Sequence, residues 1–296
     1  MITFINFYLI PGVVLGCIYA LGAIGVSLTF GILRFANFAH GDIMTFGVYI
    51  TLTLVLLTGA HPLLVAPVAM ALTALLAVAI DRLFYRPFRS SPAIMLMIAS
   101  LGMMLMIRSV VRFIWGVQLQ SLVRGIEQPL AWLEPLRLLP KHLLIITGAV
   151  VLMVAVHLLL TRTKIGKAMR ATSDNAELAR VCGIDTETVI RMTWILGSVL
   201  AVAAGVFLAI DTHVETMMGF RLLVPMFAAA ILGGIGKPYG AVAGGLVIGI
   251  VEELSAYPWI GTEPLLSPSY KAGVAFTIMV AMLIWRPQGL LHGRRF

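Results

Sequence analysis

Residues 10–33 read IPGVVLGCIYALGAIGVSLTFGIL, a run without a single Asp, Glu, Lys, Arg or His. An α-helix needs about 20 mostly apolar residues to cross a hydrocarbon core about 30 Å thick, so this run predicts a transmembrane helix. Further predominantly apolar runs of similar length lie at 42–58, 62–84, 93–115, 142–160, 192–211, 238–254 and 270–285. A ninth apolar segment, 222–236, is shorter, and we expect it to be a re-entrant or broken helix.

The composition of the whole chain agrees with that pattern. Of its 296 residues 60% are hydrophobic and 11% are charged, and the mean hydropathy is +1.01. A water-soluble fold cannot bury so much apolar surface, which excludes an ordinary cytosolic enzyme and a disordered chain. Two cysteines provide no disulfide framework. We therefore expect an all-α polytopic membrane protein with about eight transmembrane helices, surrounded by membrane lipid.

The distribution of Lys and Arg predicts which ends of these helices face the cytoplasm. If the N-terminus is outside, the inner regions carry 14 of the 21 basic residues and the outer regions carry five. The positive-inside rule favours this orientation, which places the C-terminus, with Arg294 and Arg295, in the cytoplasm. If segment 222–236 did not reverse the chain, every later segment would change side. The net charge of +8 is then explained by topology without nucleic acid as a partner. The inner set is Arg34, Arg82, Arg86, Arg89, Arg162, Lys164, Lys167, Arg170, Arg180, Arg191, Lys237, Arg286, Arg294 and Arg295, and the outer set is Arg124, Arg137, Lys141, Arg221 and Lys271.

A polar loop at 161–191 interrupts the apolar spans. Its sequence predicts two short helices, with Ser173 or Asp174 as the N-cap of one and Asp185 or Thr186 as the N-cap of the helix that follows. Gly183 is expected to end the second short helix in a left-handed conformation. Such a loop is either a solvated connector or an element shaped to dock on another protein.

Three stretches of this sequence resemble one known family. They are residues 163–171 (TKIGKAMRA), residues 37–42 (NFAHGD) and the glycine-rich residues 233–245. Together, and in the order in which they follow one another along the chain, they resemble the permeases of the branched-chain amino acid ABC importers of bacteria. The stretch 163–171 is similar to the coupling loop through which such permeases touch their ATPases. The resemblance covers nearly the whole chain.

The resemblance implies a single transmembrane permease domain, 1–296, in the bacterial inner membrane. It implies three kinds of protein partner besides membrane lipid: a second homologous permease subunit, two cytoplasmic ATPase subunits and a periplasmic substrate-binding protein. The substrates of such a permease would be leucine, isoleucine or valine, and it would move them by alternating access. The residues assigned to ATPase coupling are Lys167, Arg170, Glu177, Ala179 and Gly183. This sequence has Glu177-Leu178-Ala179 where relatives of the loop carry Glu-Ala-Ala.

Two polar or glycine-rich breaks are candidates for the transport pathway or its gate. The first contains Asn37, His40, Gly41 and Asp42, which would be costly against lipid but are tolerated where they line a cavity. The alternative is a tight turn at the cytoplasmic surface, with Asp42 as an N-cap and His40 in water.

The second break contains Gly233, Gly234 and Gly236, followed by Pro238. It predicts either a hinge or simply close packing, because Gly240 and Gly244 have the small-xxx-small spacing of closely packed helices.

Other ionisable positions carry no expected chemistry. Arg108 and Arg112, four residues apart, are expected to reach outward from their span. There is no nucleotide-binding loop, since Lys237 is followed by Pro238, and no zinc spacing or nucleophile motif. We therefore expect no cofactor, no metal and no enzyme activity, with ATP hydrolysis on partner subunits. Three alternatives remain open: a related permease for urea, short amides or other amino acids; a self-sufficient secondary carrier or channel, which would need a buried charge pair; and an intramembrane enzyme.

Overall fold

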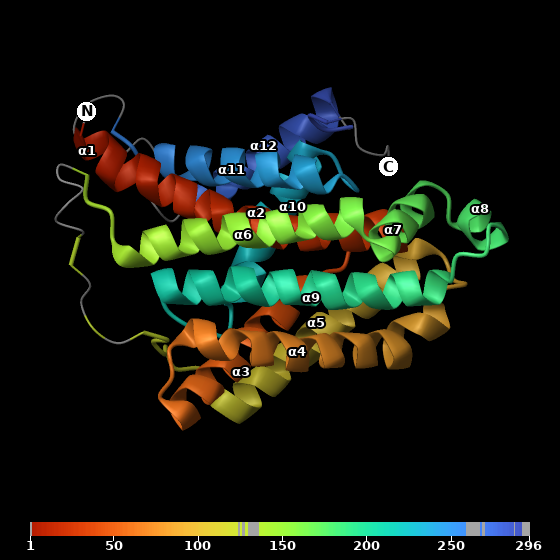
Figure 1. Cartoon of the computed structure of the whole chain (residues 1–296). Coiled ribbons are helices and arrows are strands. Elements are labelled where there is room, and N and C mark those ends of the chain that lie inside the picture. The colour runs from red at the N-terminus through yellow and green to blue at the C-terminus, as the bar shows by residue number, and fades with distance from the viewer. Residues whose placement is uncertain are drawn as a thin grey trace.

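The protein is a bundle of long helices that run side by side along one direction (Figure 1). The computed structural model describes residues 2–123, 125, 128–129, 136–258, 267, 270–286 and 288–291. Two short helices, α7 (Lys164–Asp174) and α8 (Ala176–Val181), project at one end of the bundle, and the N-terminal helix α1 (Ile2–Phe4) lies at the other end (Figure 1). In these described ranges the β-structure consists of one isolated bridge, between Gln120 and Val214. The fold is the expected all-α one.

Each of the nine apolar segments forms a helix. In the described residues, six helices are long and apolar enough to cross a membrane, counting those extended by short π or 3-10 turns. The remaining three expected spans are helices of 15 to 17 residues, and α10 corresponds to the segment expected to be short. The helices are α2 (Ile10–Leu33, after the π-helix Ile5–Leu9), α3 (His40–Thr58), α4 (Pro62–Ile80, continued by η2 Asp81–Tyr85 and η3 Arg86–Phe88), α5 (Ala93–Trp115), α6 (Pro140–Arg162), α9 (Thr186–Asp211), α10 (Met218–Gly233), α11 (Pro238–Leu254) and α12 (Lys271–Trp285).

Helix α2 is the core of the bundle, and small residues let its neighbours approach it. A Cβ atom on Gly249 of α11 would lie 2.3 Å from the Gly16 nitrogen, and one on Gly245 would lie 2.4 Å from the Ala20 Cα. On α11 itself, Gly240 packs against Gly233 of α10. The predicted close packing of this glycine-rich helix is confirmed, and its two glycine faces contact two different helices.

The same contacts fix the direction of the last helices. Gly31, near the end of α2, lies beside Gly236, just before α11, whereas Gly12, near the start of α2, lies beside Ile250 late in α11. Helix α11 is therefore antiparallel to α2. The short helix α10 does reverse the chain, as the predicted topology requires.

The outer faces of the bundle are apolar. Leu57, Leu64 and Phe113 are 77%, 74% and 91% exposed, and α6 also presents Val151 and Leu158. Such surfaces are stable only against lipid or another protein.

Ion pairs join groups that the predicted topology puts on the same side. Lys141 pairs with Asp211 at 3.1 Å, and Lys271 pairs with Glu253 at 2.7 Å, both at the end opposite α7. Residues 289–291 lie at the other end, where Leu290 and Leu291 donate backbone hydrogen bonds to Leu232 and Gly233. The predicted terminal pair Arg294 and Arg295 lies outside the described residues.

Candidate functional site

The first break lies inside the bundle. Helix α2 ends at Arg34, whose φ of 58° is left-handed, and the chain then turns back before α3 begins at His40. A Cβ atom on Gly25, in the middle of α2, would lie 2.8 Å from the His40 Cε1 atom. Helix α3 therefore starts deep in the bundle, beside the middle of α2. The alternative of a wetted turn at the cytoplasmic surface is wrong.

The polar side chains of this break are buried. Asn37, His40 and Asp42 are 3%, 2% and 1% exposed. The Asn37 Oδ1 accepts hydrogen bonds from the Ala39 nitrogen at 3.2 Å and from the Tyr85 hydroxyl at 3.4 Å. Neither Asn37 Nδ2 nor His40 Nε2 has a hydrogen-bond partner among the described residues. Buried polar atoms without partners are rare in a static core and are typical of sites that bind or move.

Asp42 does not cap α3, because it forms a buried ion pair with Arg108 of α5. The Arg108 Nε and Nη2 donate to the two carboxylate oxygens at 3.0 and 2.9 Å, and the guanidinium lies 4.6 Å from the centre of the Phe220 ring. The prediction that Arg108 reaches outward is wrong, since its side chain is 10% exposed. Arg112 is exposed as predicted, and it donates to the Met217 sulfur. Sequence reasoning missed the pair because its members lie 66 residues apart; the available signal was an arginine in an apolar span, which needs a partner.

Two helix starts meet at this pair. A Cβ atom on Gly41 would lie 2.3 Å from the Gly219 carbonyl oxygen, so α3 and α10 touch backbone to backbone. The Gly219 nitrogen donates to the Thr45 hydroxyl at 3.0 Å. Any larger residue at either glycine would push the two helices apart.

The glycine-rich break forms the turn between α10 and α11, as predicted. Gly234 and Gly236 have φ values of 104° and 81°, conformations that favour glycine. The Gly236 nitrogen donates to the Ser27 hydroxyl at 3.1 Å, which ties the turn to α2. The two breaks are not adjacent: α10 starts at the first and ends at the second, so about 21 Å of helix separates Gly219 from Gly233.

The polar loop folds as the predicted pair of helices, although its caps differ in part. Asn175 caps α8 by accepting from the nitrogens of Glu177 and Leu178 at 3.1 and 3.0 Å, in place of Ser173 or Asp174. Gly183 is left-handed at φ 83°, and Asp185 caps α9, both as predicted. Hydrogen bonds from Thr188 lower the pKa of Asp185.

Helix α7 is held firmly on the bundle. Gly166 and Met169 are buried on the same side of α7, and a Cβ atom on Gly166 would lie 2.2 Å from the Leu159 carbonyl oxygen. The Ser173 hydroxyl donates to the Gly31 carbonyl at 3.2 Å. A displacement of α7 must therefore also move α2 and α6.

The predicted coupling residues divide by exposure. Lys167, Arg170, Glu177 and Gly183 are exposed, whereas Ala179 is buried. Two residues that sequence reasoning left out are more prominent: Leu178 is 58% exposed and Val181 is 85% exposed. The free end of the loop thus presents an apolar surface with charges around it.

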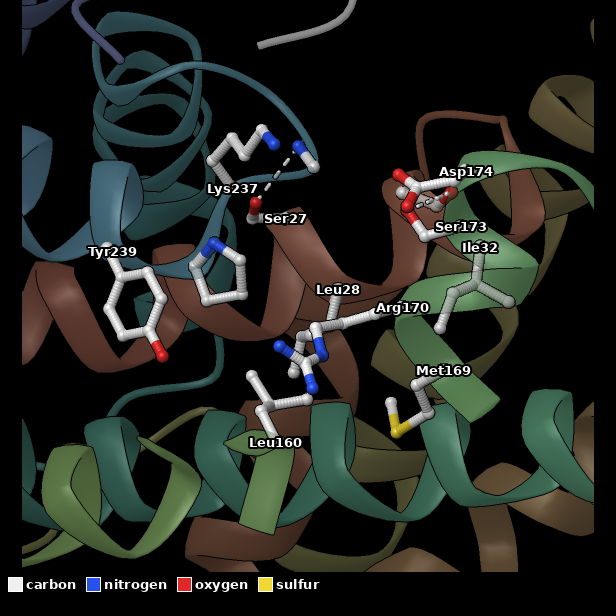
Figure 2. A pocket seen from close by; sticks show the side chains of 13 residues that line it. Ser27, Leu28, Ile32, Leu160, Met169, Arg170, Ser173, Asp174, Lys237 and Tyr239 are labelled. Atoms are coloured by element: carbon white, nitrogen blue, oxygen red, sulfur yellow. Dashed lines mark hydrogen bonds between the residues drawn. The ribbon is translucent and has the colours of Figure 1, made fainter. Parts of the chain in front are cut away.

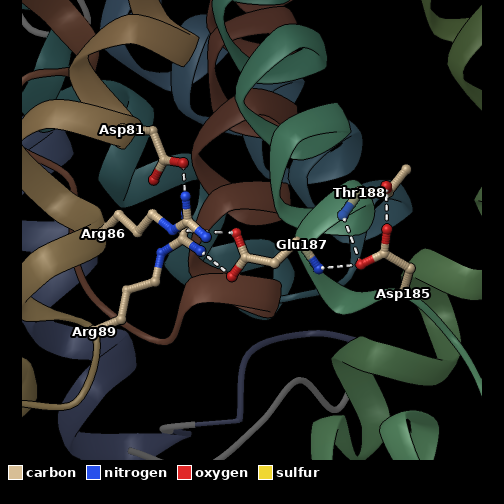
Figure 3. Close-up of polar contacts among 6 residues, drawn as sticks. All are labelled: Asp81, Arg86, Arg89, Asp185, Glu187 and Thr188. Carbon is tan, nitrogen blue, oxygen red and sulfur yellow. Dashed lines mark hydrogen bonds and ion pairs between the residues drawn. The ribbon is translucent and has the colours of Figure 1, made fainter.

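An ion network connects the start of α9 to the end of α4 (Figure 3). Arg89 bridges two carboxylates, pairing with Asp81 and, at 2.7 Å, with Glu187. Arg86 approaches Glu187 at 3.8 Å. Because α9 follows directly after α8, this network links the polar loop 161–191 to α4. No motif in the sequence indicated it.

A polytopic bundle with buried helix breaks and a docked helical loop is an architecture that fits a membrane transport protein. The sequence profile described as "Branched-chain amino acid transport system / permease component" matches residues 8–283. The chain belongs to this family.

Individual relatives align over nearly the whole chain. It is 32% identical over 295 residues to the high-affinity branched-chain amino acid transport system permease protein LivH of Escherichia coli K12, which covers 95% of this chain and 93% of that protein. It is 29% identical to the permease protein BraD of Pseudomonas aeruginosa, over 96% of this chain and 94% of that protein. Among solved structures, PsaBC from Streptococcus pneumoniae in complex with Fab matches with a TM-score of 0.53 at 12% identity, covering 97% of this chain and 95% of that chain. That likeness shows the fold alone.

Proposed function

We propose that the chain is the permease subunit of an ATP-driven importer of branched-chain amino acids in the bacterial inner membrane. The observation that carries this proposal is the alignment with LivH over 95% of the chain, which includes both helix breaks and the coupling loop. Residues 1–296 would act as one permease domain, with ATP hydrolysis on partner ATPase subunits.

The coupling loop is the proposed contact with the ATPases. Exposed Leu178 and Val181 suit an apolar groove, and exposed Lys167 and Glu177 suit charges at its rim. Buried Ala179 would act indirectly, by letting α8 lie close to the bundle, and Gly183 would set the direction of the chain into α9. The complete importer would hold two ATPases, a second homologous permease and a periplasmic binding protein.

The proposed path of coupling runs from α8 into α9. A push on α8 moves the start of α9, and the pair between Glu187 and Arg89 passes that movement to α4. At the same time α7 pulls on α2 through Ser173 and Gly31. Helices α2, α4 and α9 lie against α3, so their displacement would reach the first break.

The gate is proposed at the first break, with the glycine turn as its hinge. Asn37, His40, Gly41 and Asp42 provide buried polar groups, two of which have atoms without partners. Gly233, Gly234 and Gly236 would allow α10 to tilt. The buried pair of Asp42 and Arg108 is the kind of feature that a secondary carrier would need, but in a member of this permease family it fits a gate that ATPases open.

The orientation follows from the same assignment. If α7 and α8 meet cytoplasmic ATPases, then residues 289–291, at the same end of the bundle, lie on the cytoplasmic side. This agrees with the excess of basic residues there.

The test is substrate uptake by proteoliposomes that hold the assembled importer. We expect leucine uptake that requires ATP and the binding protein. Uptake driven by an ion gradient without ATPases would refute the assignment as an ATP-driven importer. Uptake of urea or acetamide in place of leucine, isoleucine and valine would refute the assignment of branched-chain amino acids as substrates.

A matched pair of variants tests the docking surface. Val181→Asp places a charge on the free end of α8 and should lower the recovery of ATPases with the permease at least tenfold, as expected when an interface anchor is lost. Val117→Asp, at a side chain 70% exposed on the opposite end, should leave that recovery unchanged. Equal recovery for both variants would contradict the proposed contact.

A further inference from the structure

A cavity of about 230 Å³ lies at the inner end of the bundle, apart from the first helix break. Its walls come from α2, the end of α6, the coupling helix α7 and the turn between α10 and α11 (Figure 2). Leu28, Ile32, Leu160 and Met169 form its apolar side. The cavity therefore has an apolar wall, and polar side chains line the rest of it.

Two cations from distant parts of the chain line the cavity. Arg170 belongs to α7 and Lys237 to the turn before α11. Neither forms an ion pair with a carboxylate of the described residues. Figure 2 shows the Arg170 guanidinium extending over the cavity near Leu28, while Asp174 lies away from it, beside Ser173. Two positive groups against one carboxylate leave an excess positive charge at the mouth.

The cavity lies near the ends of two apolar helices, where the headgroups of a surrounding membrane are expected. Leu28 lies five residues before the end of α2, which is about 8 Å along the helix axis. Leu160 lies two residues before the end of α6. The cavity thus spans the boundary where apolar helix surface gives way to polar loop.

The cavity also reaches an exposed side of the bundle. Tyr239, at its edge, is 50% exposed, and its hydroxyl lies 2.8 Å from Nδ1 of His157 on α6. Tyrosines in such positions commonly sit at the interface between lipid and water.

We propose that this cavity binds the phosphate group of an anionic phospholipid from the leaflet on the α7 side. Arg170 and Lys237 hold the phosphate, and the apolar wall receives the first part of an acyl chain. Free phosphate would interact with the same two cations, but it has no apolar group to contact the four apolar side chains. A bound lipid would connect the coupling helix to the α10–α11 turn, so the rate of transport would depend on the anionic lipid content of the bilayer. The lipid site does not depend on which substrate is carried.

The experiment is native mass spectrometry of the purified permease titrated with phosphatidylglycerol in detergent. We expect one phosphatidylglycerol to be retained. The double variant Arg170→Gln/Lys237→Gln should bind it about 30-fold more weakly, given the usual contribution of each basic residue near an anionic surface. The control Arg162→Gln/Lys164→Gln removes the same charge from exposed neighbours that do not line the cavity, and it should bind like the wild type.

Three further arms decide the source of the ligand. Arg170→Lys/Lys237→Arg keeps both charges and should keep binding, which separates loss of charge from loss of folding. Equal retention of zwitterionic phosphatidylcholine, or complete displacement of phosphatidylglycerol by millimolar inorganic phosphate, would overturn the lipid proposal. Release of phosphatidylglycerol when the ATPase subunits are added would also overturn it, because the cavity would then belong to the ATPase contact.

Discussion

Replacing Asp42 with Asn should destabilise the protein strongly, because it leaves Arg108 without a counter-charge inside the bundle. Asp42 is 1% exposed and the Arg108 side chain is 10% exposed, so water cannot replace the lost partner. The two hydrogen bonds measure 3.0 and 2.9 Å. Breaking such a buried pair typically costs about 3–5 kcal/mol.

We expect the lower end of that range, about 3 kcal/mol, because Asn keeps one acceptor oxygen for the guanidinium. This corresponds to roughly a 100-fold change in the unfolding equilibrium. In the double variant Asp42→Asn/Arg108→Gln neither charge remains. We expect its loss of stability to be smaller than the sum of the two single losses by about 2 kcal/mol.

The assay unfolds the purified protein in mixed micelles with increasing SDS, and tryptophan fluorescence reports the folded fraction. Arg112→Gln is the control, since Arg112 is exposed and lies one helical turn further along α5, and it should change stability by less than about 0.5 kcal/mol. If the single losses simply add in the double variant, Asp42 and Arg108 are not coupled, and the reasoning fails.

Three other changes test the packing, the cap and the ion network. Gly249→Ala forces a Cβ against the backbone of α2 and should cost about 1–3 kcal/mol in SDS unfolding, whereas Gly102→Ala, with open space at its Cβ, should cost nothing; equal effects would contradict the close α2–α11 contact. The folded pKa of Asp185 lies below its usual value, so its stabilisation of the start of α9 is present above the usual pKa and is lost as pH falls through the folded pKa. Hydrogen exchange of residues 186–189 should show this pH dependence, and Asp185→Asn should flatten it. An unchanged pH profile in the variant would argue against the cap. Glu187→Gln breaks the half-exposed pair with Arg89 and should cost about 1 kcal/mol or less of stability. The folded variant should nevertheless show a lower rate of uptake. A normal rate of uptake by a stable variant would exclude the network from coupling.

The polar loop 161–191 shows how much of a local structure can be predicted from neighbouring residues. Two short helices, the left-handed Gly183 and the Asp185 cap follow from residues within a few positions of one another. The N-cap of α8 was misassigned to Ser173 or Asp174 because Asn175, the adjacent residue, can make the same hydrogen bonds. The exposure of Leu178 and Val181 could not be foreseen, since it depends on which side of α8 faces the bundle.

The sequence by itself determined that the chain is a polytopic helical membrane protein, where its apolar helices lie, and which ends share a side. Those properties depend on the length of apolar runs and on charges next to them, and both are local. Only the tertiary structure decided that α3 starts in the middle of the bundle and that Asp42 meets Arg108. The path of a chain after a helix break depends on which neighbours have room for it. Here that room comes from Gly25 on α2, on the other side of the break, and from Gly219 on α10, far away in sequence.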